Sequence, residues 1–173
     1  SSLAFAGCTK LASVTLGEKV KTIGGNAFAN CPYLPSIDLK NVSSLSDYVF
    51  NGCTSLTSIT IPKTLTSCGS TGSFKGSSIK TAVIEKGIAH IPAYLFYNCT
   101  TLESVTIPEK DDTLLDGYKI YSNAFCNCTA LKNVTIPQSV TQIYSSAFYD
   151  CKSFTKVTIP NNVTEISGKG FRV

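Results

Sequence analysis

The sequence predicts an α/β-type solenoid in which about seven coils stack into a right-handed superhelix. The first observation is a period, because phenylalanine recurs every 22–24 residues, with one interval of 29. The second is a β-branched segment of the Val-Thr-Ile type between successive phenylalanines, and the third is a cysteine three residues after most of them. The periodic residues are Phe5, Phe28, Phe50, Phe74, Phe96, Phe125, Phe148 and Phe171.

Composition favours one ordered domain. The chain has 173 residues, 43% of them hydrophobic, and no linker rich in proline, serine or glycine divides it. We therefore expect a single repeat domain over residues 1–173 and, because the sequence opens in the middle of a repeat, a piece of a longer chain. The net charge of +4 is dispersed, and no apolar stretch approaches the ~20 residues of a membrane span. We expect no nucleic-acid partner and no membrane insertion.

Each unit contains a six-residue segment that alternates apolar and polar side chains. Such alternation, rich in β-branched residues, predicts a short strand with one side buried and the other exposed. Proline follows several of the segments and, because it has no N–H to give to a neighbouring strand, marks the strand end. The segments are LASVTL (11–16), LPSIDL (34–39), LTSITI (56–61), IKTAVI (79–84), LESVTI (102–107), LKNVTI (131–136) and FTKVTI (154–159).

A second apolar pair, such as Val20 and Ile23 or Val140 and Ile143, follows the strand and marks the return of the chain. Burying about six apolar side chains per unit contributes ~9–18 kcal/mol, whereas ordering the backbone costs roughly 1–2 kcal/mol per residue. A single unit therefore cannot fold alone. Stacked units bury each other's faces and pair their strands into a parallel sheet, which we expect on the concave face.

The composite phrase L-x-x-V/I-x-I-P-x-x-V-x-x-I-x-x-x-A-F-x-x-C resembles the BspA-like class of leucine-rich repeat proteins, over essentially the whole chain. The resemblance implies a leucine-rich repeat superhelix with irregular or short helical segments on its convex face. It also implies a surface or secreted protein of a bacterium or protist that adheres to host matrix proteins or to other cells. The expected location is extracellular or at the cell surface, and the expected partner is a protein.

The recurrent cysteine stands three residues before the strand segment, and Ser77 replaces it in the fourth unit. Because buried cysteine behaves as a compact hydrophobe, we expect a structural column of mainly free thiols inside a tight turn. A metal site is disfavoured, since the thiols lie one repeat apart rather than in CxxC pairs. Disulfides are the open alternative, because coils ~5 Å apart fall within the range that a disulfide accepts. The column is Cys8, Cys31, Cys53, Cys99, Cys128 and Cys151.

Two cysteines lie outside this column. Cys68 replaces an isoleucine of the second apolar pair, so we expect it to be buried. Cys126 directly follows Phe125, at the position that Tyr97 and Tyr149 hold in other units, so we expect it to be the most exposed thiol.

The sequence holds little catalytic chemistry. His90 is the only histidine and stands beside Pro92, which favours a surface loop residue over a general base. The chain has no phosphate-binding loop, no HExxH motif and no strand-linked glycine fingerprint. We expect no enzyme activity, no cofactor and no metal site.

The outward strand positions form a floor of small polar side chains on the predicted concave face. Threonine suits an exposed strand and supports cross-strand pairing, so a structural role competes with ligand binding here. The candidate binding residues are Ser58, Thr60, Ser104, Thr106, Asn133, Thr135 and Lys156.

Tyrosines recur in register in two further columns, Tyr121 with Tyr144 and Tyr97 with Tyr149. We expect both columns to face outward near the convex side or its edge. Packing of amphipathic rings explains them, and contact with a sugar or a protein is the alternative.

The 29-residue interval inserts a loop around EKDDTLLDGYK (109–119). Loops carry function more readily than repeated strands do. Asp111, Asp112 and Asp116 are therefore further binding candidates, although their spacing matches no EF-hand and a solvated hairpin is the alternative.

Together these features predict a non-enzymatic adhesion or protein-binding module of a larger surface protein. The alternative function is a passive spacer that displays another domain away from the cell.

Overall fold

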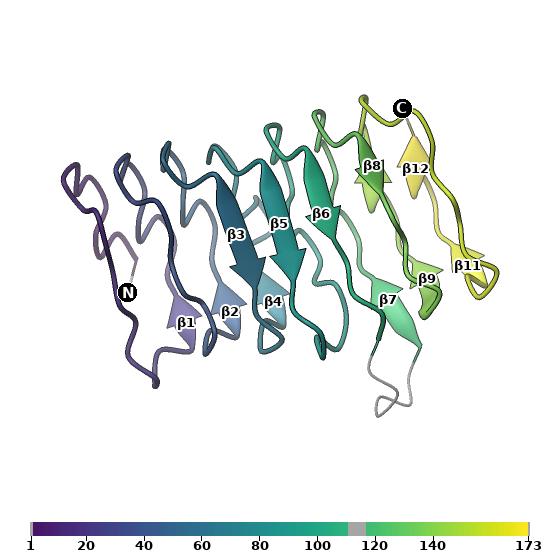
Figure 1. Ribbon diagram of the computed structural model, residues 1–173, viewed down its shortest axis with the longest axis horizontal. Helices are drawn as coiled ribbons and strands as arrows, with labels where there is room; N and C mark the ends of the chain where they lie inside the picture. Colours follow the sequence, from purple (N-terminus) through teal and green to yellow (C-terminus); the bar gives the residue numbers. More distant parts are fainter. Residues whose placement is uncertain (1, 111–116, 173) are drawn as a thin grey trace.

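The computed structural model describes residues 2–110 and 117–172. The chain winds into a solenoid of about six turns, where about seven were expected. Figure 1 shows the coils side by side, from the N-terminal coil at the left to the C-terminal coil at the right. The front strands run downward and the chain returns upward behind them while advancing to the right, which is a right-handed winding.

The front of the solenoid is a four-stranded parallel sheet in the order β3-β5-β6-β8. Burial alternates from residue to residue along β3 and β5, as the sequence predicts. The register pairs equivalent positions of successive units, for example Thr60 with Val83 and Val83 with Thr106. The strands are β3 (Ser58–Ile61), β5 (Thr81–Ile84), β6 (Ser104–Thr106) and β8 (Asn133–Val134).

The predicted segments 11–16, 34–39 and 154–159 form no strand. In segment 34–39, Pro35 has no N–H to give to segment 11–16, although the equivalent amides of Lys80 and Glu103 each donate to the preceding coil. The carboxylate of Asp38 accepts a hydrogen bond from the backbone N–H of Lys40 at 2.9 Å, which holds the chain in a local turn instead. Nothing in the structure explains the absence of pairing in segment 154–159.

Short parallel strands also form behind the front sheet, where the sequence analysis expected only a returning chain. The first back sheet contains β1 (Thr22–Ile23), β2 (Ser44–Leu45) and β4 (Ser67–Cys68). The second back sheet contains β7 (Tyr118–Ile120), β9 (Val140–Ile143) and β11 (Glu165–Ile166), and Ile91 adds an isolated bridge to Ile120. A further pair joins β10 (Phe148–Tyr149) to β12 (Phe171–Arg172).

Pro92 separates the two back sheets. At the equivalent position of neighbouring coils, Gly69 donates its N–H to the carbonyl of Leu45 at 2.8 Å and Tyr121 donates to Ile91 at 3.1 Å. Proline has no N–H to give, so this bond is missing between Cys68 and the coil of Pro92. We call this junction, between the coil of residues 66–77 and that of residues 88–98, the seam.

The backbone hydrogen bonds between the turns that follow the back strands are also missing at the seam. The amide of Phe50 donates to Ser73 in the next coil, and the amide of Phe96 donates to Ala124. Within residues 66–98, all of which the structure describes, the amides of Phe74 and Gly76 make no such bond. The front sheet crosses the seam without a break, because β5 pairs with both β3 and β6.

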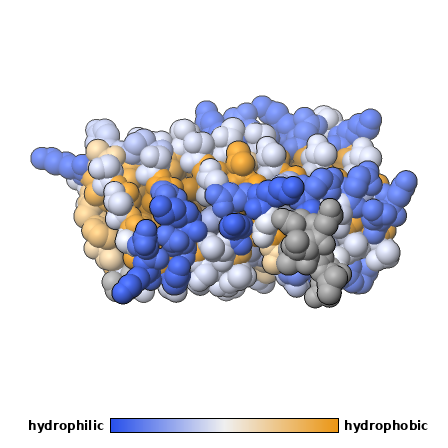
Figure 2. Space-filling model, turned by 60° about the horizontal axis from the view of Figure 1, so that its bottom comes forward, coloured by the Kyte–Doolittle hydropathy of each residue, from blue (hydrophilic) through white to orange (hydrophobic). Residues whose placement is uncertain are grey.

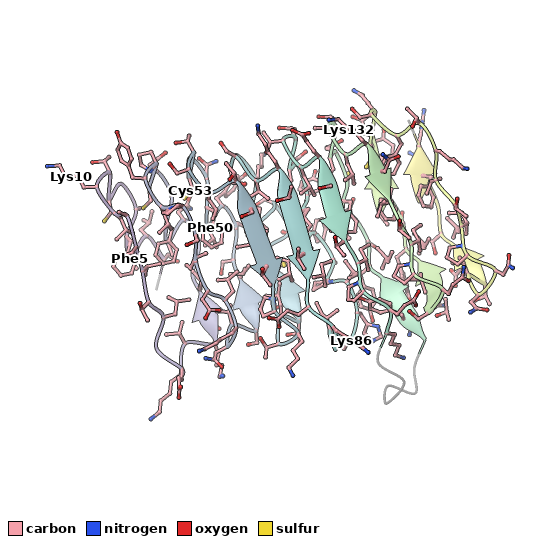
Figure 3. The ribbon with its side chains drawn as sticks, viewed as in Figure 1. Phe5, Lys10, Phe50, Cys53, Lys86 and Lys132 are labelled. Atoms are coloured by element: carbon pink, nitrogen blue, oxygen red, sulfur yellow. The ribbon has the colours of Figure 1, made fainter. Side chains whose placement is uncertain are left out.

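The periodic phenylalanines form a column of stacked rings inside the coils, as Figure 3 shows for Phe5 and Phe50. The ring centroids of Phe50 and Phe74 lie 5.3 Å apart, with 8° between the ring planes. At the seam the angle between Phe74 and Phe96 opens to 28°. The column belongs to one continuous hydrophobic core, which confirms that equivalent positions of the repeat stack on one another.

The α/β class and the convex helical segments were wrong, because none of the described residues forms a helix. The turns around each phenylalanine explain this result. Asn26 and Asn30 flank Phe28 with φ angles of 55° and 57°, and Asn123 and Asn127 flank Phe125 with 59° and 60°. A right-handed helix does not accommodate left-handed residues at this spacing, so the fold is an all-β solenoid.

Candidate binding surfaces

The front sheet presents the predicted polar floor to solvent. The strand alternation turns Ile59, Val105 and their equivalents inward and leaves every second side chain outside. An apolar residue lies among the polar ones, since Val83 is 50% exposed between Thr60 and Thr106. All seven candidate residues are exposed, namely Ser58, Thr60, Ser104, Thr106, Asn133, Thr135 and Lys156.

A groove of about 510 Å³ borders the front sheet on its N-terminal side. Segment 36–40 forms one wall, and β3 with β5 forms the other. The groove exists where the Asp38 turn keeps segment 34–39 from pairing with β3. It brings together Ser58 and Thr60 of the predicted set with the carboxylates of Asp38 and Glu85, which sequence reasoning had not included.

A second groove, of about 340 Å³, borders the sheet on its C-terminal side. It lies between β8 and the unpaired segment 154–159, and Asn133, Thr135 and Lys156 line it. The front sheet is therefore framed by two recesses, and both follow from segments that do not join it.

An ion pair lies at the upper edge of the front sheet, where Figure 3 labels Lys132. The ammonium of Lys132 donates a hydrogen bond to the Glu103 carboxylate at 2.9 Å. This bond and the charge of Lys132 lower the pKa of Glu103. Lys80, Glu103 and Lys132 line a shallow recess that also contains Ser104.

The binding candidates Asp111, Asp112 and Asp116 lie outside the described residues. The described part of the insert is anchored by Glu109, whose carboxylate accepts hydrogen bonds from the backbone N–H groups of Gln138 and Ser139 and from the Ser139 hydroxyl. Although partial desolvation acts to raise it, these hydrogen bonds lower the pKa of Glu109.

The thiols of the cysteine column connect successive coils. The Sγ atom of Cys53 donates to the carbonyl of Phe28 at 3.1 Å, and that of Cys128 donates to Phe96 at 3.2 Å. Ser77 differs, because its hydroxyl donates to Phe74 of its own coil at 2.7 Å. The same bond to the preceding coil is made by Cys31, Cys99 and Cys151.

Burial raises the pKa of the five thiols that bond to the preceding coil. The pKa of Cys53 rises to about 11 and that of Cys151 to about 12. All eight cysteines are free thiols in the structure. The five bonded thiols connect neighbouring coils and stay protonated at neutral pH.

The exposure predicted for Cys126 was wrong, since its side chain is only 5% exposed. Its side chain is shorter than those of Tyr97 and Tyr149 and lies between the two coils that carry them. Backbone hydrogen bonds from Asn98 to Cys126 and from Asn127 to Tyr149 join the three coils. Burial and the nearby Asp150 charge raise the pKa of Cys126. Cys68, expected to be buried, is only half-buried.

The described residues contain no group of three or more metal-ligating side chains. The ring of His90 packs edge-on against Tyr121, with 5.5 Å between the ring centroids. Tyr121 in turn lies 5.1 Å from Tyr144. Sequence reasoning found the tyrosine pair but missed His90 as its neighbour, because it did not recognise the back sheet that brings the three rings into line.

Apolar surface is visible toward the left end of Figure 2, at the N-terminal coil. Leu3 and Phe5 are 62% and 42% exposed there. Among residues 2–110 and 117–172, no helix is long and apolar enough to cross a membrane.

Parallel strands at equivalent positions of successive coils, a stacked phenylalanine column and a cysteine turn define a solenoid of the leucine-rich repeat class. The family model of the BspA type leucine rich repeat region matches six copies, over residues 1–103 and 90–173. The chain therefore belongs to the BspA-type leucine-rich repeat family, which confirms the resemblance in its sequence. Such domains are generally non-enzymatic scaffolds that bind proteins.

Solved structures of bacterial proteins share this fold. A leucine-rich repeat protein from Bacteroides ovatus is 29% identical with a TM-score of 0.71, and the match covers 96% of this chain and 42% of that one. A leucine-rich repeat protein from Eubacterium ventriosum is 27% identical with a TM-score of 0.67, covering 90% and 41%. The T. pallidum leucine-rich repeat protein is 23% identical with a TM-score of 0.57, and the match covers 96% of this chain and 64% of that one. At this identity it supports the fold alone.

The chain spans less than half the length of the first two of these structures. The comparison with curated proteins gave no significant match.

Proposed function

We propose that this chain is an adhesion module of a cell-surface or secreted protein, and that it binds a protein ligand through its front sheet. The observation that carries the proposal is the pair of grooves that frame an exposed sheet. Exposed Val83 offers apolar contact at the centre, and Asp38 and Lys156 offer charges at the two borders. The ligand class is a host matrix protein or another cell-surface protein, as the family suggests.

The front sheet alone is too polar to bind by burial of apolar area. Its hydroxyl groups offer hydrogen bonds in register, and the grooves admit side chains of a partner. Protein interfaces of this kind depend on a few anchoring contacts, so a change at one central position removes much of the affinity.

The test uses surface plasmon resonance of the full 173-residue chain against immobilised fibronectin, laminin and collagen. Ser58→Lys and Ser104→Lys place a long cation on the front sheet, at the position that Lys156 holds in the sequence of its own unit. The matched control is Ser44→Lys on the first back sheet, where Lys119 stands in the equivalent column. Front variants are expected to lose about tenfold or more in affinity, and the control to bind like the natural chain.

Equal loss in the control would overturn the assignment to the front sheet. Absence of saturable binding to all three proteins and to whole cells would favour the alternative, a passive spacer that displays another domain.

A further inference from the structure

The outer surface of the back sheets changes chemistry at the seam. In a strand, residues two positions apart point to the same side, so the positions on either side of the buried Ile23 or Ile143 face outward. Two outward columns result. Before the seam they hold Thr22, Ser44, Ser67, Gly24, Ser46 and Gly69. From the coil of Pro92 onward, one column holds His90, Lys119, Gln142 and Glu165, and the other holds the buried Pro92 followed by Tyr121, Tyr144 and Ser167.

We call the second group the aromatic face. Its rings form a continuous row over three coils, since the centroids of His90 and Tyr121 lie 5.5 Å apart and those of Tyr121 and Tyr144 lie 5.1 Å apart. All three side chains are half-buried, so each ring keeps part of its surface in solvent.

Polar groups beside the rings are already oriented by hydrogen bonds. The Tyr144 hydroxyl donates to Oε1 of Gln142 at 3.4 Å. Nε2 of Gln142 donates to Glu165 at 3.1 Å, and the Ser167 hydroxyl donates to the same carboxylate at 2.8 Å. The register places Lys119 beside Gln142. Side chains held in this way lose little further freedom when a ligand binds.

The core does not need these rings. Ile120 and Ile143, the inward residues next to Tyr121 and Tyr144, are fully buried. Leu45 of the first back sheet is buried equally well, although its outward neighbour is the small Ser46. Small side chains therefore suffice to cover the core at this position. The tyrosines add surface that packing alone does not require.

We propose that the aromatic face binds an uncharged oligosaccharide. The apolar faces of adjacent pyranose rings stack on Tyr121 and on Tyr144, whose ring planes are inclined by 43° to each other. The sugar hydroxyl groups bond to the amide of Gln142, the carboxylate of Glu165 and the ammonium of Lys119. The positive charge of Lys119 and the negative charge of Glu165 leave these two side chains without a net charge. This balance disfavours a sulfated or phosphorylated ligand. The site is distinct from the front sheet and adds a second activity to the proposed protein binding.

The size of the face favours a sugar over a protein. Three coils at ~4.8 Å and two outward side chains ~7 Å apart cover a patch of roughly 15 Å by 7 Å. A stable protein interface needs about 800 Å² on each partner, several times this area. The patch matches a short oligosaccharide lying along the solenoid axis.

The test is a titration of the ¹⁵N-labelled full chain, followed by NMR, with linear hexasaccharides of glucose, mannose and N-acetylglucosamine. We expect saturable shifts of the Tyr121, Gln142 and Tyr144 amides with at least one of them. Tyr121→Ser and Tyr144→Ser should each weaken binding about tenfold. Serine already occurs at the equivalent position of other coils, as Ser46 and Ser167. Their spectra also show directly that the variants fold.

The matched control is Tyr97→Ala, which removes a tyrosine from the neighbouring turn, where Ala6 and Ala29 occupy the same position in other coils. It should bind the sugar unchanged, as should the front-sheet variant Ser58→Lys, which separates this proposal from the adhesion proposal. Absence of saturable shifts with all three sugars would overturn the inference. So would undiminished binding in both tyrosine variants, or shifts of these amides only with a protein ligand.

Discussion

The Sγ atom of Cys53 lies 3.1 Å from the carbonyl oxygen of Phe28, in the preceding coil, and donates a hydrogen bond to it. Each phenylalanine carbonyl of the column can accept such a bond from the next coil. Among the described residues the Phe50 carbonyl receives no thiol, because Ser77 in the next coil donates to Phe74 of its own coil. One side chain thus leaves one junction of the column unlinked.

Ser77→Cys should therefore stabilise the chain. A thiol at this position reaches back to Phe50 as Cys53 reaches Phe28, and we expect a gain of ~0.5–1 kcal/mol in the free energy of unfolding. Urea denaturation under reducing conditions measures it. The control Ser77→Ala, which removes the hydroxyl and adds no thiol, should lose ~1 kcal/mol. Equal stability of the two variants would show that the thiol bond contributes nothing.

The buried thiols make stability depend on pH in the alkaline range. Burial raises the pKa of Cys53 to about 11 and that of Cys151 to about 12, from 9.0. The folded state therefore holds these protons more tightly than the unfolded state. Their contribution is fully present below pH 9 and is lost as the pH rises from 9 toward 12, by up to ~1.4 kcal/mol per pH unit and thiol.

The measurement is the urea midpoint at pH 8.0 and at pH 10.5, with reductant present. Cys53→Ala and Cys151→Ala should each show a smaller drop between the two pH values than the natural chain. A drop of the same size in both variants would assign the alkaline instability to tyrosine or lysine instead.

Ser146→Asn should stabilise the turn before Phe148. Ser146 has a φ angle of 58°, and the equivalent residues of other coils include Asn26 and Asn123, at 55° and 59°. Asparagine tolerates this conformation better than other residues with a side chain, so we expect ~0.5–1 kcal/mol from thermal unfolding. Ser55→Asn, at an exposed position outside the left-handed region, should change nothing.

The seam should be visible in amide hydrogen exchange. The amides of Phe74 and Gly76 make no backbone bond to the next coil, whereas those of Phe50 and Phe96 do. We expect Phe74 and Gly76 to exchange at least about tenfold faster than Phe50 and Phe96, although all three phenylalanine side chains are buried. Equal protection of these amides would mean that the coils close across the seam in solution.

The sequence predicted the parts of the fold that depend on repetition. Phe50 stacks on Phe74, and Thr60 pairs with Val83, because residues one period apart occupy equivalent positions in neighbouring coils. The prediction of convex helices failed because it came from the general class of leucine-rich repeats. The alternation of Asn26 and Asn30 around Phe28 was a signal for left-handed turns, and it was not used.

The candidate site was predicted only in part. The polar outer side of the front sheet followed from strand alternation. The grooves beside it depend on segments that fail to pair, and whether a segment pairs depends on the neighbouring coil as well as on its own sequence. Asp38, which stands where the paired strands have threonine or valine, was the available signal for the first groove. The row of His90, Tyr121 and Tyr144 was hidden because the short back strands carry too few residues to show alternation.

Pro92 also determines how the molecule responds to mechanical load. The hydrogen bonds between coils run along the long axis, so tension applied at the two ends pulls directly on them, one junction after another. At the seam that tension is carried by the front sheet and by a few side chains such as Cys99, whose thiol contacts Phe74 at 3.4 Å. We expect the back of the molecule to open at this junction, between two blocks that each keep a paired back sheet. Recoil then needs only the docking of two preformed ends.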